Sequence, residues 1–100
     1  MADKDKKDNK SIQVDIDEVI AQGTYSNMVI SNYSQEEFIL DFVFLQPQQP
    51  KGKIRSRIIL SPKNAKRLLK LLSTNIKDYE KHFGTIQDGN NDQGIKLSIN

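Results

Sequence analysis

The sequence predicts an α+β domain, in which a four-stranded antiparallel sheet is followed by one long C-terminal amphipathic helix. Two patterns carry this prediction. Apolar residues alternate with polar ones in several short segments, which is the period of a half-buried strand. A stripe of apolar residues then recurs at helical spacing over about five turns. The length of 100 residues fits one domain.

Four segments have the composition of strands: 12–20, 24–33, 38–45 and 54–60. In the first, Ile12, Val14 and Ile16 alternate with Gln13, Asp15 and Asp17. The third is apolar on both faces apart from Asp41, which is typical of a central strand. The segment 34–37 between the second and third strands is a polar turn.

The helix begins at Ser61-Pro62, a hydroxyl N-cap with proline at the first helical position. Gly84 stands where a left-handed C-cap is expected. The apolar stripe comprises residues 65, 68, 69, 72, 76, 79 and 83. We expect this stripe to cover one face of the sheet and to give a two-layer domain.

The ends of the chain are polar. We expect residues 1–11 to form a disordered tail, because the first ten alternate Lys and Asp and carry no large apolar residue after Met1. We expect residues 12–87 to form the folded domain. Residues 88–100 are predicted to be a flexible tail, or to add a short fifth strand at 95–100, where apolar residues alternate again.

Charge is separated along the chain. Residues 51–83 hold ten Lys/Arg against two acids, whereas residues 11–50 hold six acids and no base. Candidate contacts for a nucleic acid or another partner are Lys51, Lys53, Arg55, Lys63, Lys66, Arg67 and Lys70. No aromatic residue lies among these cations in the sequence to stack on a base. A solvated face, or a face that meets the acidic strand of another subunit, is the alternative.

The central strand predicts an interface and an ion pair. If the helix covers one face of the sheet, the other face still presents apolar side chains, and such patches mark interfaces. The candidate oligomer interface is Ile39, Val43, Leu45 and Ile59. Asp41 interrupts this apolar strand, and we expect it to pair with Arg57, or with Arg55, on the neighbouring strand.

Catalytic and metal-binding patterns are not evident. The single histidine, His82, falls in the last turn of the helix, where the helix dipole favours a cation. The sequence has no GxSxG, Walker, GxGxxG or HExxH motif and no cysteine. Asp15, Asp17 and Glu18 lack the spacing of a calcium loop. We therefore predict no enzyme activity, no cofactor, no metal and no membrane span, and we expect a cytoplasmic protein.

Four strings of residues resemble a family of small bacterial proteins catalogued as domain of unknown function 3467. They are YSNMVIS (25–31), EFILDF (37–42), RIILSPKNAKRLL (57–69) and NIKDYEKHFGTI (75–86). The resemblance covers about residues 12–87. It implies a bacterial cytosolic origin and carries over no catalytic residue, because the family has no established activity. The order of elements is also similar to that of SecB-type export chaperones, in architecture alone.

These observations favour a small homo-oligomeric binding or scaffolding module, a homodimer or larger assembly, with a protein partner. The first alternative is a nucleic-acid-binding accessory protein that uses the basic residues of 51–70. The second is a SecB-like chaperone, which would need an exposed apolar groove. No small-molecule substrate is indicated.

Overall fold

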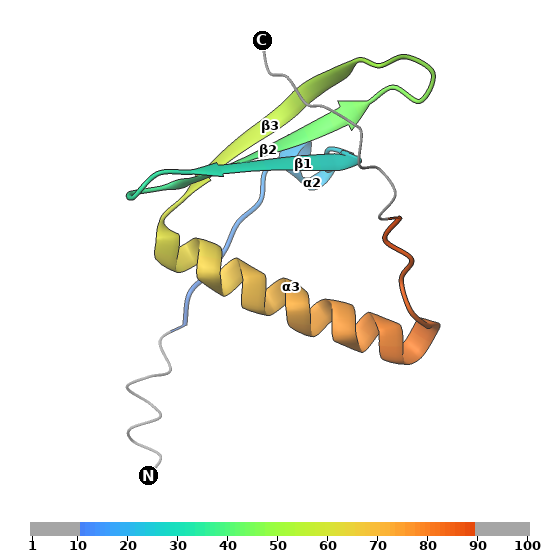
Figure 1. The fold of residues 1–100 in the computed structure, drawn as a ribbon. Helices are drawn as coiled ribbons and strands as arrows, with labels where there is room; N and C mark the ends of the chain where they lie inside the picture. The colour runs from blue at the N-terminus through green and yellow to red at the C-terminus, as the bar shows by residue number, and fades with distance from the viewer. Residues whose placement is uncertain (1–10, 90–100) are drawn as a thin grey trace. The chain divides into compact units, whose positions relative to one another are not determined.

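The structure, a computed structural model, describes residues 11–89. In chain order its elements are α2 (Glu18–Ala21), β1 (Met28–Tyr33), β2 (Phe38–Leu45), β3 (Gly52–Leu60) and α3 (Pro62–Phe83) (Figure 1). Three antiparallel strands followed by a long helix confirm the predicted α+β class. The candidate fifth strand at 95–100 and most of both predicted tails lie outside the described residues.

The three strands form one sheet in the order β1-β2-β3, so β2 is central, as its apolar composition predicted. Short connections make the neighbours antiparallel. Between β1 and β2 the N–H of Ser34 donates to the carbonyl of Glu37 at 2.9 Å, and the Ser34 hydroxyl accepts from the N–H of Glu36 at 3.2 Å. The predicted polar turn at 34–37 therefore closes the first hairpin.

The predicted strand at 12–20 is not formed, so the sheet has three strands within residues 11–89 rather than four. Residues 11–17 have no regular structure, and Glu18–Ala21 form the single turn of α2. The N–H of Ala21 donates to the carbonyl of Asp17 at 2.8 Å, which closes this turn. Gly23, with a φ of 81°, then takes the chain out of it. Alternation of apolar residues makes a strand only where a neighbouring strand accepts its backbone groups.

The chain divides into two compact units. Within the described residues, the first contains 11–31 and 40–58, and the second contains 32–39 and 59–89. Most of the sheet belongs to the first unit, and α3 belongs to the second. The expectation that α3 covers one face of the sheet stays a prediction.

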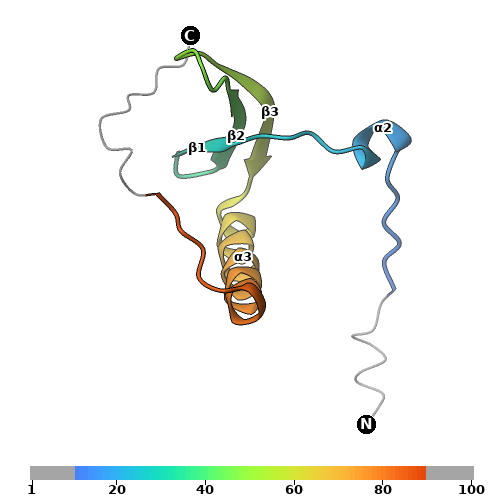
Figure 2. The same cartoon turned by 90° about the vertical axis from the view of Figure 1, so that its right-hand side faces the viewer.

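The predicted helix α3 is confirmed, and Figures 1 and 2 both show it as one continuous helix. The Ser61 hydroxyl accepts from the N–H of Asn64 at 3.2 Å, and Pro62 is the first helical residue. At the other end the N–H of Gly84 donates to the carbonyl of Glu80 at 3.0 Å. Gly84 has a φ of 97° and a ψ of 168°, a glycine conformation outside the left-handed helical region that was expected. No helix among the described residues is long and apolar enough to cross a membrane.

The most buried positions lie on β2. Asp41 is fully buried and Val43 is 5% exposed, and within residues 11–89 no other side chain, polar or apolar, is as fully covered. Both residues are odd-numbered members of the central strand and share one of its faces. The core of the first unit is therefore a small cluster around a buried carboxylate.

Candidate functional site

The β2–β3 hairpin is shaped by its loop. The N–H of Gln46 donates to the carbonyl of Lys51 at 3.0 Å, and the N–H of Gln49 donates to the carbonyl of Gln46 at 3.3 Å. The second bond closes a four-residue turn with Pro47 at its second position, where the fixed φ of proline fits. The N–H of Lys51 donates in addition to the carbonyl of Gln49 at 2.7 Å. The loop is thus held to itself by backbone bonds, and residues 46–51 are all exposed.

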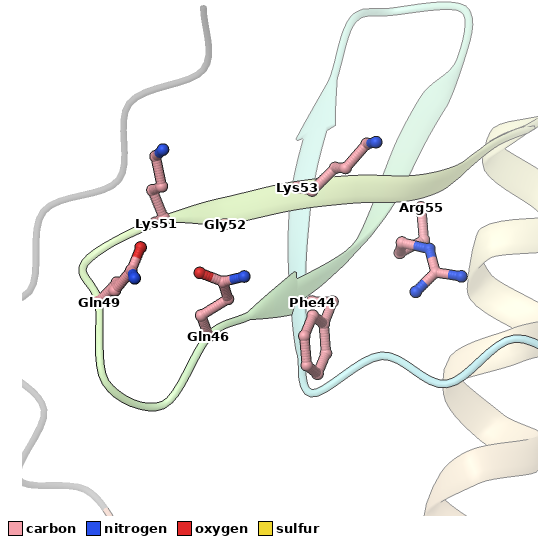
Figure 3. A pocket seen from close by; sticks show the side chains of 7 residues that line it. All are labelled: Phe44, Gln46, Gln49, Lys51, Gly52, Lys53 and Arg55. Atoms are coloured by element: carbon pink, nitrogen blue, oxygen red, sulfur yellow. The ribbon is translucent and has the colours of Figure 1, made fainter.

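A shallow hollow of about 690 Å³ lies along this hairpin. Its lining residues come from the end of β2, the loop and the first half of β3: Phe44, Gln46, Gln49, Lys51, Gly52, Lys53 and Arg55. In the view of Figure 3, the Phe44 ring and the Arg55 guanidinium lie on one side of the β3 ribbon, and the ammonium groups of Lys51 and Lys53 lie along the other. The hollow therefore combines one aromatic ring, two amides and three cations.

The electrostatic character of the hollow is uniform. Lys51, Lys53 and Arg55 are all exposed, and none of the seven lining residues carries a negative charge. A cluster of cations without a carboxylate among them attracts anions, and phosphate groups are anions that Lys and Arg commonly hold. The charge of the hollow is thus complementary to an anionic group such as a phosphate.

The aromatic ring of the hollow is supported from outside the hairpin. Tyr25, which precedes β1, meets Phe44 edge to face with ring centroids 6.3 Å apart and an interplanar angle of 68°. Tyr25 itself is 69% exposed. Phe44 therefore shares the hollow with the cations of β3, although no aromatic residue lies between 51 and 70 in the sequence. The antiparallel pairing of β2 with β3 creates this juxtaposition, and hairpin register was the signal that could have revealed it.

The predicted basic residues fall into two groups. Lys51, Lys53 and Arg55 line the hollow in the first compact unit. The remaining four lie on the first half of α3, in the second unit, and all of them are exposed: Lys63, Lys66, Arg67 and Lys70. The hairpin group shares its hollow with the aromatic residue Phe44.

Asp41 and Arg57 form a two-point ion pair. Arg57 Nε donates to Asp41 Oδ1 at 2.7 Å, and Arg57 Nη2 donates to Asp41 Oδ2 at 2.9 Å. Hydrogen bonding to Arg57 is the main reason that the pKa of Asp41 is lowered, and burial of the carboxyl opposes this shift. The same bonds raise the pKa of Arg57. The paired geometry satisfies a buried charge, which is a structural role.

The four residues of the candidate oligomer interface differ in exposure. Val43 is buried within the single chain, Ile39 and Leu45 are half-buried, and Ile59 is 56% exposed. Val43 is thus covered before any partner binds. Ile59 and Ile39 lie in the second unit, whereas Val43 and Leu45 lie in the first.

The other ionisable residues singled out in the sequence form no site. His82 Nδ1 lies 2.9 Å from the carbonyl oxygen of Asp78, one turn earlier on α3, and 3.7 Å from the Asp78 carboxylate. Asp15, Asp17 and Glu18 are exposed. Within residues 11–89 no three His, Asp or Glu side chains come together in a way that could hold a metal ion.

Asn27 makes side-chain hydrogen bonds to the backbone of β2 that the sequence did not reveal. Its side-chain Nδ2 donates to the carbonyl of Leu45 at 3.1 Å, and its Oδ1 accepts from the N–H of Leu45 at 2.8 Å. Its own N–H donates to the carbonyl of Val43 at 3.0 Å. The side-chain amide therefore replaces a peptide group at the end of the β1–β2 ladder and fixes the last residue of β2 beside the hollow.

Comparison with known proteins identifies the family. The model of the family described as "Protein of unknown function (DUF3467)" matches residues 1–88, a span that includes all four strings on which the resemblance rested. No curated protein and no solved structure matches the chain. Because the match spans most of the sequence, the chain belongs to the DUF3467 family.

Proposed function

We propose that this protein is a binding module for single-stranded nucleic acid, and that the hollow of the β2–β3 hairpin is its contact surface. The observation that carries the proposal is that Phe44 lines the same hollow as Lys51, Lys53 and Arg55. Proteins that bind single strands combine a positively charged groove for the backbone with aromatic rings on which bases stack. The hairpin supplies both parts.

Each part of the hollow has a distinct task in this proposal. The cations of Lys51, Lys53 and Arg55 contact phosphates, and a base stacks on the Phe44 ring, with Tyr25 at the edge of that ring. The two amides, of Gln46 and Gln49, offer both donors and acceptors to the edges of an unpaired base. A duplex hides its bases inside the stack, so single strands fit this surface better.

The proposal is tested by fluorescence anisotropy with labelled single-stranded RNA, single-stranded DNA and duplex DNA at several salt concentrations. Contact of three cations with a single strand predicts that log affinity falls with log salt at a slope of about −2. If the four cations of α3 also contact the strand, the slope is about −5. Equal binding to all three probes, or no binding at low salt, would contradict a single-strand site.

Variants separate stacking from charge. Phe44→Leu keeps an apolar side chain and removes the aromatic face, and we expect it to weaken binding by about tenfold without changing the salt slope. Lys51→Glu with Lys53→Glu is expected to reduce both affinity and slope. The matched control is Lys77→Glu with Lys81→Glu on the last turns of α3, which makes the same change in net charge outside the hollow. Circular dichroism verifies that each variant is folded.

A second candidate function, a homo-oligomeric module, has a separate observation in its favour. Much of the apolar surface of the first unit is uncovered in the single chain, including Ile12 at 82%, Val14 at 87% and Ile16 at 65% exposure. Exposed apolar clusters of this kind mark interfaces, and homodimers are the commonest assemblies. Sedimentation velocity across a concentration series tests this candidate, and a monomer at all concentrations would contradict it.

A further inference from the structure

We infer that residues 11–17 of one copy of the chain pair with the open edge of β3 in a second copy. This inference rests on the proposed self-association and names the contact that would produce it. The contact has two parts. One is a segment with the sequence pattern of a strand but no strand partner within the described residues, and the other is a sheet edge that has no strand of the described chain beside it. Both lie in the first compact unit.

The segment 11–17 carries the sequence pattern of a strand. Ile12, Val14 and Ile16 alternate with polar residues, yet all three are exposed and the segment belongs to no sheet within residues 11–89. Figure 2 draws it without a strand arrow. Within residues 11–89 the backbone groups of 11–16 make no backbone hydrogen bond, and the Asp17 carbonyl accepts from the Ala21 N–H. In a strand the alternation would give the segment one apolar face and one acidic face.

The edge of β3 offers a matching surface. In the order β1-β2-β3, β3 has β2 on one side and no strand of the described chain on the other. Its residues alternate as well: Ile54 and Ser56 are half-buried, whereas Lys53 and Arg55 are exposed. An unpaired edge binds extended segments by strand addition, in which main-chain bonds supply affinity and side chains supply register.

Charge complementarity selects the partner for this edge. Alternate residues of one strand share a face, so a register that sets the apolar face of 11–17 beside Ile54 sets its opposite face beside Lys53 and Arg55. Asp15 and Asp17 supply the negative charge that this second face requires. The other edge, β1, carries no charged residue between Met28 and Tyr33, so it offers no such match. Reciprocal exchange of two such segments closes a twofold dimer.

A charge-reversal pair tests the inference in the absence of nucleic acid. Variant one carries Asp15→Lys and Asp17→Lys, and variant two carries Lys53→Asp and Arg55→Asp. Each alone places like charges opposite each other at both contacts of a dimer, so we expect its dimer dissociation constant to rise by about a hundredfold. Mixing the two variants restores opposite charges at both contacts, because the basic segment of variant one meets the acidic edge of variant two, and the acidic segment of variant two meets the basic edge of variant one. We therefore expect the mixture to form a heterodimer.

A third protein gives an independent test with a single chain. A chain that carries all four reversals has a basic segment and an acidic edge, so two copies of it restore opposite charges at both contacts. We expect this quadruple variant to dimerise with near wild-type affinity, although each of its halves alone does not. Multi-angle light scattering and native mass spectrometry measure the mass of each species and so distinguish monomer from dimer.

Matched controls make the same charge changes elsewhere. Glu36→Lys with Glu37→Lys in the β1–β2 turn, and Lys63→Asp with Lys66→Asp at the start of α3, should leave the wild-type dimer intact. A wild-type monomer would overturn both self-association and this contact. A dimer that survives in each double variant, or a quadruple variant that stays monomeric, would overturn the contact alone. The nucleic-acid proposal is tested separately, by the anisotropy titrations.

Discussion

The carboxylate of Asp41 and the guanidinium of Arg57 meet through two hydrogen bonds, of 2.7 and 2.9 Å, in the least exposed part of the sheet. Asp41 is fully buried, whereas the Arg57 side chain is 52% exposed. The charge that depends on the pair is thus the carboxylate, because water still reaches the guanidinium. Removal of Arg57, which leaves a buried carboxylate unpaired, is therefore expected to lower the stability more than removal of Asp41, which leaves an arginine that water can reach.

Arg57→Met is expected to lower the Tm by about 10 °C or more, because it leaves a buried carboxylate without a partner. Asp41→Leu combined with Arg57→Met should recover much of that loss, since an apolar pair of similar volume often replaces a buried ion pair without cost. Thermal melts of the single and double variants check this. A double variant less stable than Arg57→Met would show that the pair contributes more than charge neutralisation.

The pH dependence of stability reflects the lowered pKa of Asp41. The unfolded carboxyl has a pKa of about 3.9, so the pair contributes its full stabilisation above that pH and loses it as pH falls through the folded pKa. Urea unfolding between about pH 5 and about pH 2 should therefore show a decline that is shallower in Asp41→Asn. Equal slopes in the two proteins would contradict an ion pair as the source of the shift.

Asn27→Ala should reduce the free energy of unfolding by about 1–2 kcal/mol, because it removes both bonds to the backbone of Leu45. Asn27→Asp retains the acceptor for the Leu45 N–H but places a carboxylate against the Leu45 carbonyl, so it should be no more stable than alanine. Urea denaturation measures both. Faster amide exchange at Leu45 in both variants would locate the effect, and unchanged exchange there would argue against it.

Gly52→Ala should destabilise the hairpin by about 1–3 kcal/mol through crowding. A Cβ at position 52 would lie 2.8 Å from Cδ2 of Leu45 and 3.1 Å from Cγ1 of Val43, and Val43 is buried. The loss should be smaller when Leu45→Val is present, a coupling that a double-mutant cycle measures. Lys51→Ala, at the exposed neighbouring position, serves as the control and should stay within about 0.5 kcal/mol of wild type.

Local sequence signals located most elements of the fold. The boundaries of β2 agree with prediction at both ends, because eight consecutive residues of mainly strand-forming type lie between a polar turn and a proline-containing loop. The helix α3 agrees as well, since Ser61, Pro62 and Gly84 each favour a backbone conformation that depends on immediate neighbours. The strand expected at 12–20 did not form, because a strand depends on a partner that no local pattern can specify.

The hollow on the hairpin likewise combines features that local sequence revealed with one that depends on a distant residue. The cations of 51–55 are visible in the sequence, and so is the asymmetry of charge between the two halves of the chain. The aromatic ring among them was not visible, because Phe44 lies on another strand and comes near Arg55 only through antiparallel pairing. Asn27 is a similar case, since its two bonds to Leu45 span 18 residues.

By itself, the sequence determined the α+β class, the limits of α3, the central place of β2 and the family, all of which rest on period, capping chemistry and residue order. The tertiary structure decided that three strands rather than four pair within residues 11–89, that Arg57 rather than Arg55 holds Asp41, and that Phe44 lines one hollow with three cations. These outcomes depend on register between strands, and register is set by contacts between residues that are distant in sequence.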